Sequence, residues 1–273
     1  MKSRIMLCSV LLSVLLIAAC GPTQPQQSKG AFLGGTQGVV ATFEPLGTKD
    51  PDSGLFTIFD TEDFPLEIVL KNKGEESVSA GKANLKLLGP AREEFQNLVP
   101  ANWETRNRAT IDKISEFNPQ GGEEIVSFTP TARAKFVGRV TTFRDITWNL
   151  EYWYDYKTQV IVNDVCFKGD PIDNKVCKID EAKTFAVSGA PIAVTKVEED
   201  QGGKGVMVLK LEVQNVGSGK SAIPGQAFDN RFDQLKFSID EPTKWECQSS
   251  GRENEARLVD KKAEIICRLK TPL

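Results

Sequence analysis

Segment 217–221 (GSGKS) has residue types that hold a phosphate group in nucleotide-binding loops. Such a loop needs an earlier glycine, which would fall on Gln214, and a following helix whose N-terminus faces the phosphate. Here Pro224 and Gly225 interrupt any helix after the segment. The segment is therefore predicted to be a flexible connection after a strand, without a bound nucleotide.

Segment 50–54 (DPDSG) begins like a calcium-binding loop. It lacks the third oxygen ligand before the glycine and the glutamate six positions after it, so the EF-hand pattern fails. An irregular calcium site that recruits Asp60, Glu62 or Asp63 stays open, although a solvated acidic turn is the more common structure. No metal or other cofactor is predicted.

Acid–base catalysis would have to rely on carboxylates, because the chain contains no histidine. This excludes Ser-His-Asp and Cys-His triads and histidine-ligated metals. Asp164, Asp170 and Asp173, or the run 198–200 (EED), could supply paired carboxylates for glycoside hydrolysis, which depends on their separation. Solvated turns are the simpler interpretation, and the sequence predicts a protein that is not an enzyme.

The densest group of aromatic residues lies in segment 148–156 (WNLEYWYDY). In a strand, Tyr152 and Tyr154 share the face that packs on the core, and Trp153 points to the opposite face with Glu151 and Asp155. A tryptophan between carboxylates on a sheet surface could stack on a sugar or dock a partner. Trp153, Glu151 and Asp155 are the predicted ligand contacts, and burial of the tryptophan is the alternative.

The strands that must position these residues are repeated along the chain. Residues 66–74 read LEIVLKNKG, and residues 209–217 read LKLEVQNVG. In both copies apolar residues alternate with period two, which is typical of a half-buried strand. Asn and Gly then end the strand, as residues that tolerate positive φ do at turns. The repeat predicts two structurally related domains.

Short predicted strands flank both copies in the same order. They lie at 39–43, 83–87 and 124–128 in the first copy, and at 192–197, 235–239 and 264–269 in the second. Many short strands separated by turn residues are typical of antiparallel sandwiches. The predicted fold class is all-β, with one immunoglobulin-like sandwich over 36–187, a second over 188–273, and a junction at 187–191.

The first predicted sandwich is longer than the second because of extra residues after position 131. Apolar residues alternate over 146–154 and again over 160–164, with a turn between the two segments. This pattern predicts a long hairpin added to the first sandwich. Segment 93–98 is predicted to be a short helix between strands.

The strand at 66–74 and 209–217 resembles the L-x-V-x-V-x-N-x-G strand of CARDB-type immunoglobulin-like domains, which occur in surface and adhesion proteins. The resemblance covers roughly half of each copy, and it implies seven-strand sandwiches used for display or contact. It carries over no catalytic residues. Chance similarity is the alternative, since alternating strands that end in Asn or Gly are common.

The first twenty residues have the pattern of an export signal. Lys2 and Arg4 precede an apolar run over 5–19, which is shorter than a membrane-spanning helix and ends in small residues. Its end, LIAAC, resembles the prokaryotic lipobox, which implies cleavage before Cys20 and lipidation of that thiol by acyl chains such as palmitate. An uncleaved anchor or an ordinary secretory signal is the alternative. Residues 1–19 are thus the predicted lipoprotein signal peptide, and 20–35 a lipidated flexible tether.

Four cysteines follow the tether, and an even number in an exported chain predicts two disulfides. We expect Cys166 to pair with Cys177 and Cys247 with Cys267, because each pair lies within one predicted domain. Three connectivities are possible. A metal site made of four thiolates is the alternative, but it lacks the short spacing of zinc knuckles.

The sequence therefore favours a protein that is lipid-anchored at the extracytoplasmic face of the cell membrane. A net charge of −3 provides no basic surface for nucleic acid. The expected function is a non-enzymatic display, adhesion or envelope-interaction module with a protein or polysaccharide partner. A carbohydrate-binding module that uses the aromatics around Trp153 is the alternative.

Overall fold

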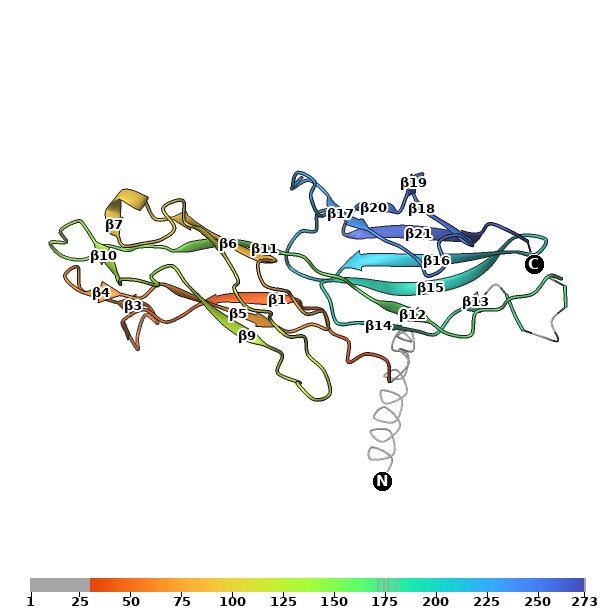
Figure 1. Cartoon of the computed structure of the whole chain (residues 1–273), viewed down its shortest axis with the longest axis horizontal. Coiled ribbons are helices and arrows are strands. Elements are labelled where there is room, and N and C mark those ends of the chain that lie inside the picture. The colour runs from red at the N-terminus through yellow and green to blue at the C-terminus, as the bar shows by residue number, and fades with distance from the viewer. Residues whose placement is uncertain (1–29, 171, 174, 176, 180, 273) are drawn as a thin grey trace, which may run out of the picture.

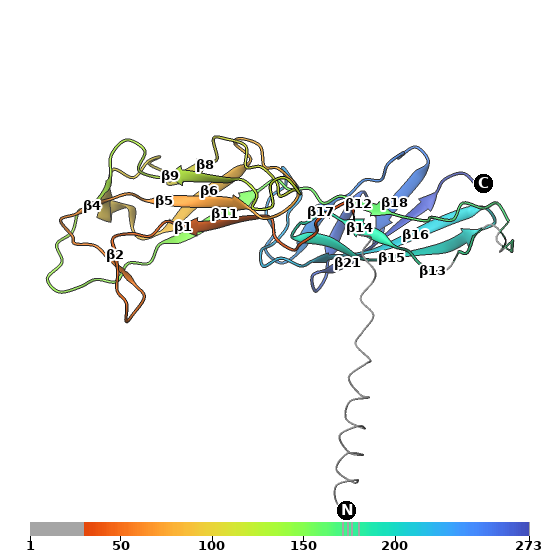
Figure 2. The same cartoon turned by 90° about the horizontal axis from the view of Figure 1, so that it is seen from below.

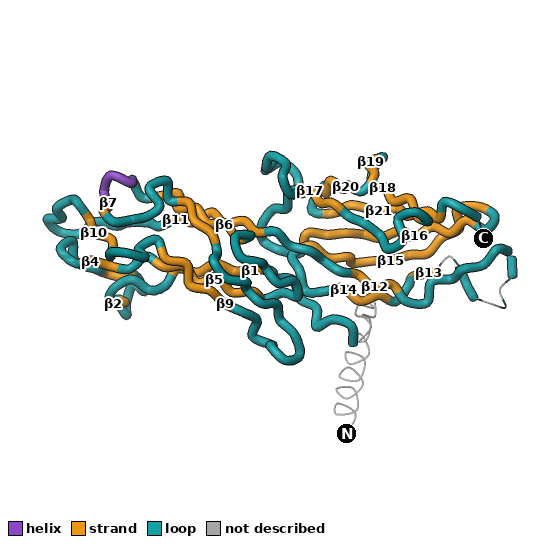
Figure 3. The backbone as a smooth tube through the Cα atoms, in the orientation of Figure 1, coloured by secondary structure: helices purple, strands orange, loops and turns teal. Residues whose placement is uncertain are grey.

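The strands of the computed structural model form two groups that lie end to end along the longest axis of the molecule (Figures 1 and 2). The structure describes residues 30–170, 172–173, 175, 177–179 and 181–272. Within these residues the only helical element is a single 3-10 turn, η1 (Arg92–Glu94), and no helix is long and apolar enough to cross a membrane (Figure 3). The predicted all-β fold class with antiparallel sandwiches is confirmed.

The first group is a sandwich of two three-stranded sheets, extended at its outer end. One sheet has the order β1 (Val39–Phe43), β5 (Glu67–Asn72), β9 (Glu123–Ser127), and the other β11 (Asn149–Tyr154), β6 (Ala83–Gly89), β8 (Glu104–Arg106). A smaller sheet and a hairpin complete the group: β4 (Asp63–Phe64), β10 (Ala134–Phe136) and β7 (Phe95–Gln96), then β2 (Thr48–Lys49) with β3 (Phe56–Thr57).

Alternation along the strands builds the core of this sandwich. Ile68 and Leu70 of β5 and Leu85 of β6 are fully buried, whereas their sequence neighbours are half-buried. Toward the outer end the core becomes aromatic, and the rings of Phe95 and Trp148 lie 4.9 Å apart. Burial of apolar side chains in this way supplies most of the free energy of folding.

The second group has one large sheet and two small ones. The large sheet has the order β13 (Glu181–Ala182), β15 (Ile192–Gly203), β16 (Val206–Asn215), β21 (Lys262–Leu269), β18 (Trp245–Ser249), β19 (Arg252–Glu253). The small sheets pair β17 (Asp233–Lys236) with β20 (Glu255–Leu258), and β12 (Val160–Val162) with β14 (Phe185–Val187).

The sequence repeat occupies equivalent places in the two groups. Strand β5 lies between β1 and β9, and strand β16 lies between β15 and β21. At the end of each strand a buried asparagine accepts a hydrogen bond from the glycine amide two residues later, at 3.1 Å from Gly74 N to Asn72 Oδ1 and 3.0 Å from Gly217 N to Asn215 Oδ1. The N-x-G motif therefore stabilises the turn after this strand in both groups.

The hairpin predicted for the first sandwich is wrong. Strand β11 pairs with β6, and β12 pairs with β14, with Ile161 opposite Ala186. Val160 and Val162 pack against the second core, which contains Phe185 and Val187. Strands β12 and β14 thus belong to the core of the second group, although the sequence placed them in a first sandwich ending at 187. Of the short helix predicted over 93–98, only Glu93 and Glu94 are helical, as the end of η1, and β7 begins at Phe95.

The Glu75 carboxylate is one of the links between the two groups. Glu75 Oε2 accepts hydrogen bonds from Gly189 N at 2.7 Å and from Gly34 N at 2.9 Å, and Oε1 accepts one from Leu33 N at 2.9 Å. Residues 33–35 are therefore held by the folded part, and the predicted flexible tether 20–35 does not extend through them. The predicted signal peptide 1–19 and lipidated Cys20 lie outside the described residues.

Replacing Tyr156 with phenylalanine should reduce the loss of stability at alkaline pH. The hydroxyl accepts a hydrogen bond from Glu76 N at 3.2 Å, and burial raises its pKa from 10.0 to about 12. Because the folded pKa exceeds the unfolded value, the contribution of this group is complete below pH 10 and is lost as the pH rises toward 12. Urea unfolding at several pH values should show a shallower decline for Tyr156→Phe than for the unsubstituted protein.

Tyr152→Phe is the matched control, because the Tyr152 ring is partly exposed. It should change the decline less than Tyr156→Phe does, because it removes only the charge repulsion that Tyr152 exerts on Tyr154. Burial raises the pKa of Tyr154 as well, so part of the alkaline decline remains in both variants. Equal declines in the Tyr156→Phe variant and the unsubstituted protein would contradict the prediction.

Candidate functional site

The cysteines pair as predicted, and the first pair closes a loop beside a buried ion pair. Cys166 lies at disulfide distance from Cys177, and Cys247 from Cys267. Cys166 N donates to both carboxylate oxygens of Glu199, at 3.0 and 3.1 Å, and Lys183 Nζ lies 2.7 Å from Glu199 Oε2. This ion pair fixes the base of the disulfide loop, so it is a structural feature.

The acidic residues considered for catalysis are not assembled into one site. Asp170 Oδ1 accepts a hydrogen bond from Ile172 N at 3.0 Å, and Asp173 Oδ1 accepts one from Lys175 N at 2.9 Å. Asp164 contributes its main-chain oxygen, which accepts a hydrogen bond from Lys183 Nζ at 3.0 Å. The carboxylates of Asp170 and Asp173 therefore each accept a hydrogen bond within their own turn.

The phosphate-loop look-alike is a turn, as predicted. Ser221 N donates to Asp233 Oδ1 at 2.7 Å, and Gly219 O accepts a hydrogen bond from Asn215 Nδ2 at 2.9 Å. Lys220 Nζ lies 3.6 Å from Asp233 Oδ2. These interactions stabilise the turn, and a bound phosphate would have to break them.

The calcium-loop look-alike is an Asx turn. Asp50 Oδ1 accepts hydrogen bonds from Asp52 N at 2.8 Å and Ser53 N at 3.0 Å, and these bonds lower the pKa of Asp50. Asp60 and Glu62 accept main-chain hydrogen bonds from Val140 and Phe59. Across the described part of the chain, no group of three Cys, Asp or Glu side chains could hold a metal ion.

Trp153 lies on an exposed sheet face, which we call the Trp153 face. We define it by eight residues on or next to β11, β6 and β8: Glu151, Trp153, Asp155, Lys82, Asn84, Lys86, Glu104 and Arg106. The indole is 48% exposed, whereas Leu85 on the opposite side of the sheet is fully buried. The predicted orientation of Trp153 away from the core is confirmed.

Strand register sets the arrangement of polar groups around the indole. Trp153 is opposite Asn84, which is opposite Arg106, and Glu151 is opposite Lys86. Lys86 Nζ lies 2.6 Å from a carboxylate oxygen of Glu104, and Lys82 Nζ lies 3.0 Å from Asp155 Oδ2. An exposed aromatic ring is thus surrounded by hydrogen-bond donors and acceptors whose charges balance.

Strand β11 is also at the edge of its sheet, because its one strand neighbour among the described residues is β6. An edge strand presents main-chain groups that a second chain could pair with. The Trp153 face therefore combines an aromatic anchor, a polar surround and an open edge. Binding of a partner is the chemistry that these features allow.

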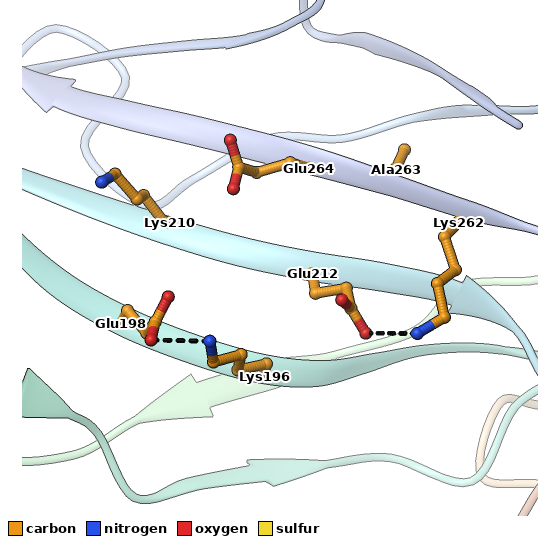
Figure 4. A pocket seen from close by; sticks show the side chains of 7 residues that line it. All are labelled: Lys196, Glu198, Lys210, Glu212, Lys262, Ala263 and Glu264. Carbon is orange, nitrogen blue, oxygen red and sulfur yellow. Dashed lines mark hydrogen bonds and ion pairs between the residues drawn. The ribbon is translucent and has the colours of Figure 1, made fainter.

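A second surface, which the sequence interpretation missed, covers the large sheet of the second group (Figure 4). The pattern K-x-E occurs once on each of three adjacent strands, with the residues Lys196, Glu198, Lys210, Glu212, Lys262 and Glu264 around a shallow hollow of 290 Å³. Antiparallel pairing places Lys196 opposite Glu212 and Glu198 opposite Lys210. The three K-x-E triplets were the signal that could have identified this surface.

The charges of this K-x-E surface neutralise one another. Lys196 Nζ lies 2.6 Å from Glu198 Oε1, and Lys262 Nζ lies 3.0 Å from Glu212 Oε1. Hydrogen bonds from Thr195 and Lys262 lower the pKa of Glu212, so its carboxylate stays ionised. Exposed pairs of this kind add little stability, but they keep a wide sheet face polar. The K-x-E surface therefore disfavours apolar partners, unlike the Trp153 face.

No family model, curated protein or solved structure matches the chain. The class of the protein is therefore defined by its structure: an all-β protein of two antiparallel sandwiches with two disulfide pairs.

Proposed function

We propose that this chain is a lipid-anchored, non-enzymatic contact protein of the extracytoplasmic membrane face, which binds a partner protein through the Trp153 face. The exposed indole on an edge strand is the observation that carries the proposal. Aromatic side chains that can be fully desolvated dominate the binding energy of protein interfaces. An unpaired edge adds main-chain hydrogen bonds to such a contact.

Two further observations support the cellular setting in this proposal. The end of the N-terminal apolar run resembles a lipobox, and the folded part carries two cysteine pairs at disulfide distance. Disulfides persist mainly in exported proteins. Mass spectrometry of the protein from native membranes should find acyl chains on Cys20.

Trp153→Ala should weaken partner binding at least about tenfold, because a buried tryptophan is typically worth more than about 1.4 kcal/mol at an interface. Cross-linking and pull-down from native membranes with the lipidated chain identify the partner, and titration with that purified partner measures the affinity. The fold should be unaffected, since the side chain lies outside the core.

Phe117→Ala is the matched control, because that side chain is 98% exposed and lies outside the Trp153 face. It should leave the affinity unchanged. Equal affinity of the Trp153→Ala variant and the unsubstituted chain for a partner that pulls down specifically would reject the Trp153 face as the contact.

A polysaccharide is the second candidate partner for the same face. The balanced donors and acceptors around Trp153, among them Asn84 and Arg106, favour it, because sugar hydroxyls both donate and accept hydrogen bonds. Quenching of tryptophan fluorescence by envelope polysaccharide, lost in Trp153→Ala, would select this candidate over a protein partner.

A further inference from the structure

The loop between β16 and β17, residues 216–232, has a base that is fixed in the second group (Figure 1). Ile223 is buried, and Asp233 at the end of the loop accepts hydrogen bonds from Ser221 N at 2.7 Å and from Asn215 Nδ2 at 2.8 Å. A main-chain hydrogen bond also holds the base of the loop, in which Gln234 N donates to Ser221 O at 3.0 Å. The loop is thus positioned by buried polar groups and by the core.

An ion pair shapes the rim of this loop. Asp229 Oδ1 lies 2.9 Å from Arg231 Nε, and Oδ2 lies 2.8 Å from Arg231 Nη2. Hydrogen bonds from Arg231 lower the pKa of Asp229 to about 2, so the pair stays ionised and neutral overall. The Phe232 ring lies between Arg231 and Arg257, whose guanidinium carbons are 5.5 and 4.3 Å from the ring centroid.

Asp229 and Arg231 border a wide, open hollow of 690 Å³. Its lining combines an aromatic ring, Phe228, which is 59% exposed, with the side-chain amides of Gln226, Asn230 and Gln234.

We propose that this hollow, which we call the 226–234 hollow, binds a neutral saccharide. Side-chain amides both donate and accept hydrogen bonds, as vicinal hydroxyls require, and the Phe228 ring offers a surface for the apolar face of a sugar. An anionic or cationic ligand gains little, because Asp229 and Arg231 already neutralise each other. A purely apolar ligand would cover the amides without replacing their hydrogen bonds to water. This site is separate from the Trp153 face and does not depend on it.

The test uses the full lipidated chain in detergent, with the neutral oligosaccharides cellotriose, maltotriose and chitotriose as probes and inorganic phosphate as the charged comparison. Saturation-transfer NMR detects binding, and titration measures the affinity. At least one neutral probe should bind, and Phe228→Ala should weaken its binding about tenfold. Gln234→Ala should weaken it in the same direction, and Phe143→Ala, which removes an exposed phenylalanine from the first group, should have no effect.

Trp153→Ala separates this proposal from the contact proposed for the Trp153 face. Saccharide binding that survives Trp153→Ala and falls in Phe228→Ala supports the 226–234 hollow. Saccharide binding that survives Phe228→Ala, or that is lost only in Trp153→Ala, overturns it. Absence of binding by all three neutral probes, or displacement of a bound sugar by phosphate, also overturns it. Circular dichroism confirms that each variant is folded.

Discussion

Replacing Lys183 with methionine should lower the free energy of unfolding by about 3–5 kcal/mol, the cost of breaking a buried ion pair from one side. The side chains of Lys183 and Glu199 are 3% and 0% exposed, and Lys183 Nζ lies 2.7 Å from the carboxylate. Without the ammonium group, the carboxylate stays buried with Cys166 N as its remaining described donor. Urea unfolding followed by circular dichroism measures the loss.

The control for this prediction is an exposed pair of the same residue types. Lys244 and Glu241 are 63% and 62% exposed, and Lys244→Met should change the free energy by less than about 0.5 kcal/mol. The double variant Lys183→Met with Glu199→Leu should recover part of the lost stability, because no charge is left buried. A loss below about 1 kcal/mol in Lys183→Met would show that water reaches Glu199.

The same pair has a pH dependence with a defined sign. Burial acts to lower the pKa of Lys183, but hydrogen bonds and charge attraction to Glu181 and Glu199 outweigh it, so the pKa is raised above 10.5. The contribution of Lys183 to stability is therefore complete below pH 10.5 and declines as the pH rises through the folded pKa. The stability difference between the unsubstituted protein and Lys183→Met should narrow over that range.

Asn72→Ala should lower the free energy of unfolding by about 3 kcal/mol, at about 1 kcal/mol for each of the three hydrogen bonds that its side chain makes with main-chain groups. Asn72 Oδ1 accepts from Gly74 N at 3.1 Å, and Nδ2 donates to Glu76 O at 2.6 Å and to Ile111 O at 3.3 Å. Asn72→Asp should be equally costly, because a carboxylate cannot donate to the two main-chain oxygens. Asn102→Ala is the control, since that side chain is exposed.

Asn215→Ala should have a similar cost in the second group, because the repeat gives Asn215 the same hydrogen bond to a glycine amide. Trp245 lies in the second core and Trp148 packs on the first, so tryptophan fluorescence in single-tryptophan chains reports which group unfolds. Losses below about 1 kcal/mol in both variants would mean that water replaces the lost amide.

The repeat made the central strands predictable, because alternation and an N-x-G ending are properties of neighbouring residues. The partner of a strand is not such a property. Val160 and Val162 have the alternation of a strand, but the residues next to them in the sequence do not specify which strand they pair with. In the structure they pair with the strand of Phe185 and Val187 and not with β11. Pairing between distant segments depends on the tertiary structure, and this is why the extra hairpin was predicted wrongly.

Glu199 shows how a local charge pattern was misinterpreted. The run 198–200 was taken as a solvated turn because it is acidic, but β15 continues through it to Gly203. Alternation from Val197 places Glu199 on the buried side, and its partner Lys183 lies on a different segment. By contrast, the outward orientation of Trp153 followed correctly from the alternation of β11. Glu151 is on the same face of the strand, whereas Leu150 and Tyr154 are on the other face and pack on the first core.

The hydrogen bonds that Glu75 accepts from Leu33 and Gly34 determine where the chain leaves the folded body. Glu75 also accepts a hydrogen bond from Gly189 of the second group, so these bonds lie where the two groups meet. The two groups meet near the middle of the long axis (Figure 1). With the anchor that we propose at Cys20, the molecule would be attached near its middle, with one sandwich on each side of the attachment point. A pull on the anchor would then load the Glu75 junction first, before any strand of either sheet.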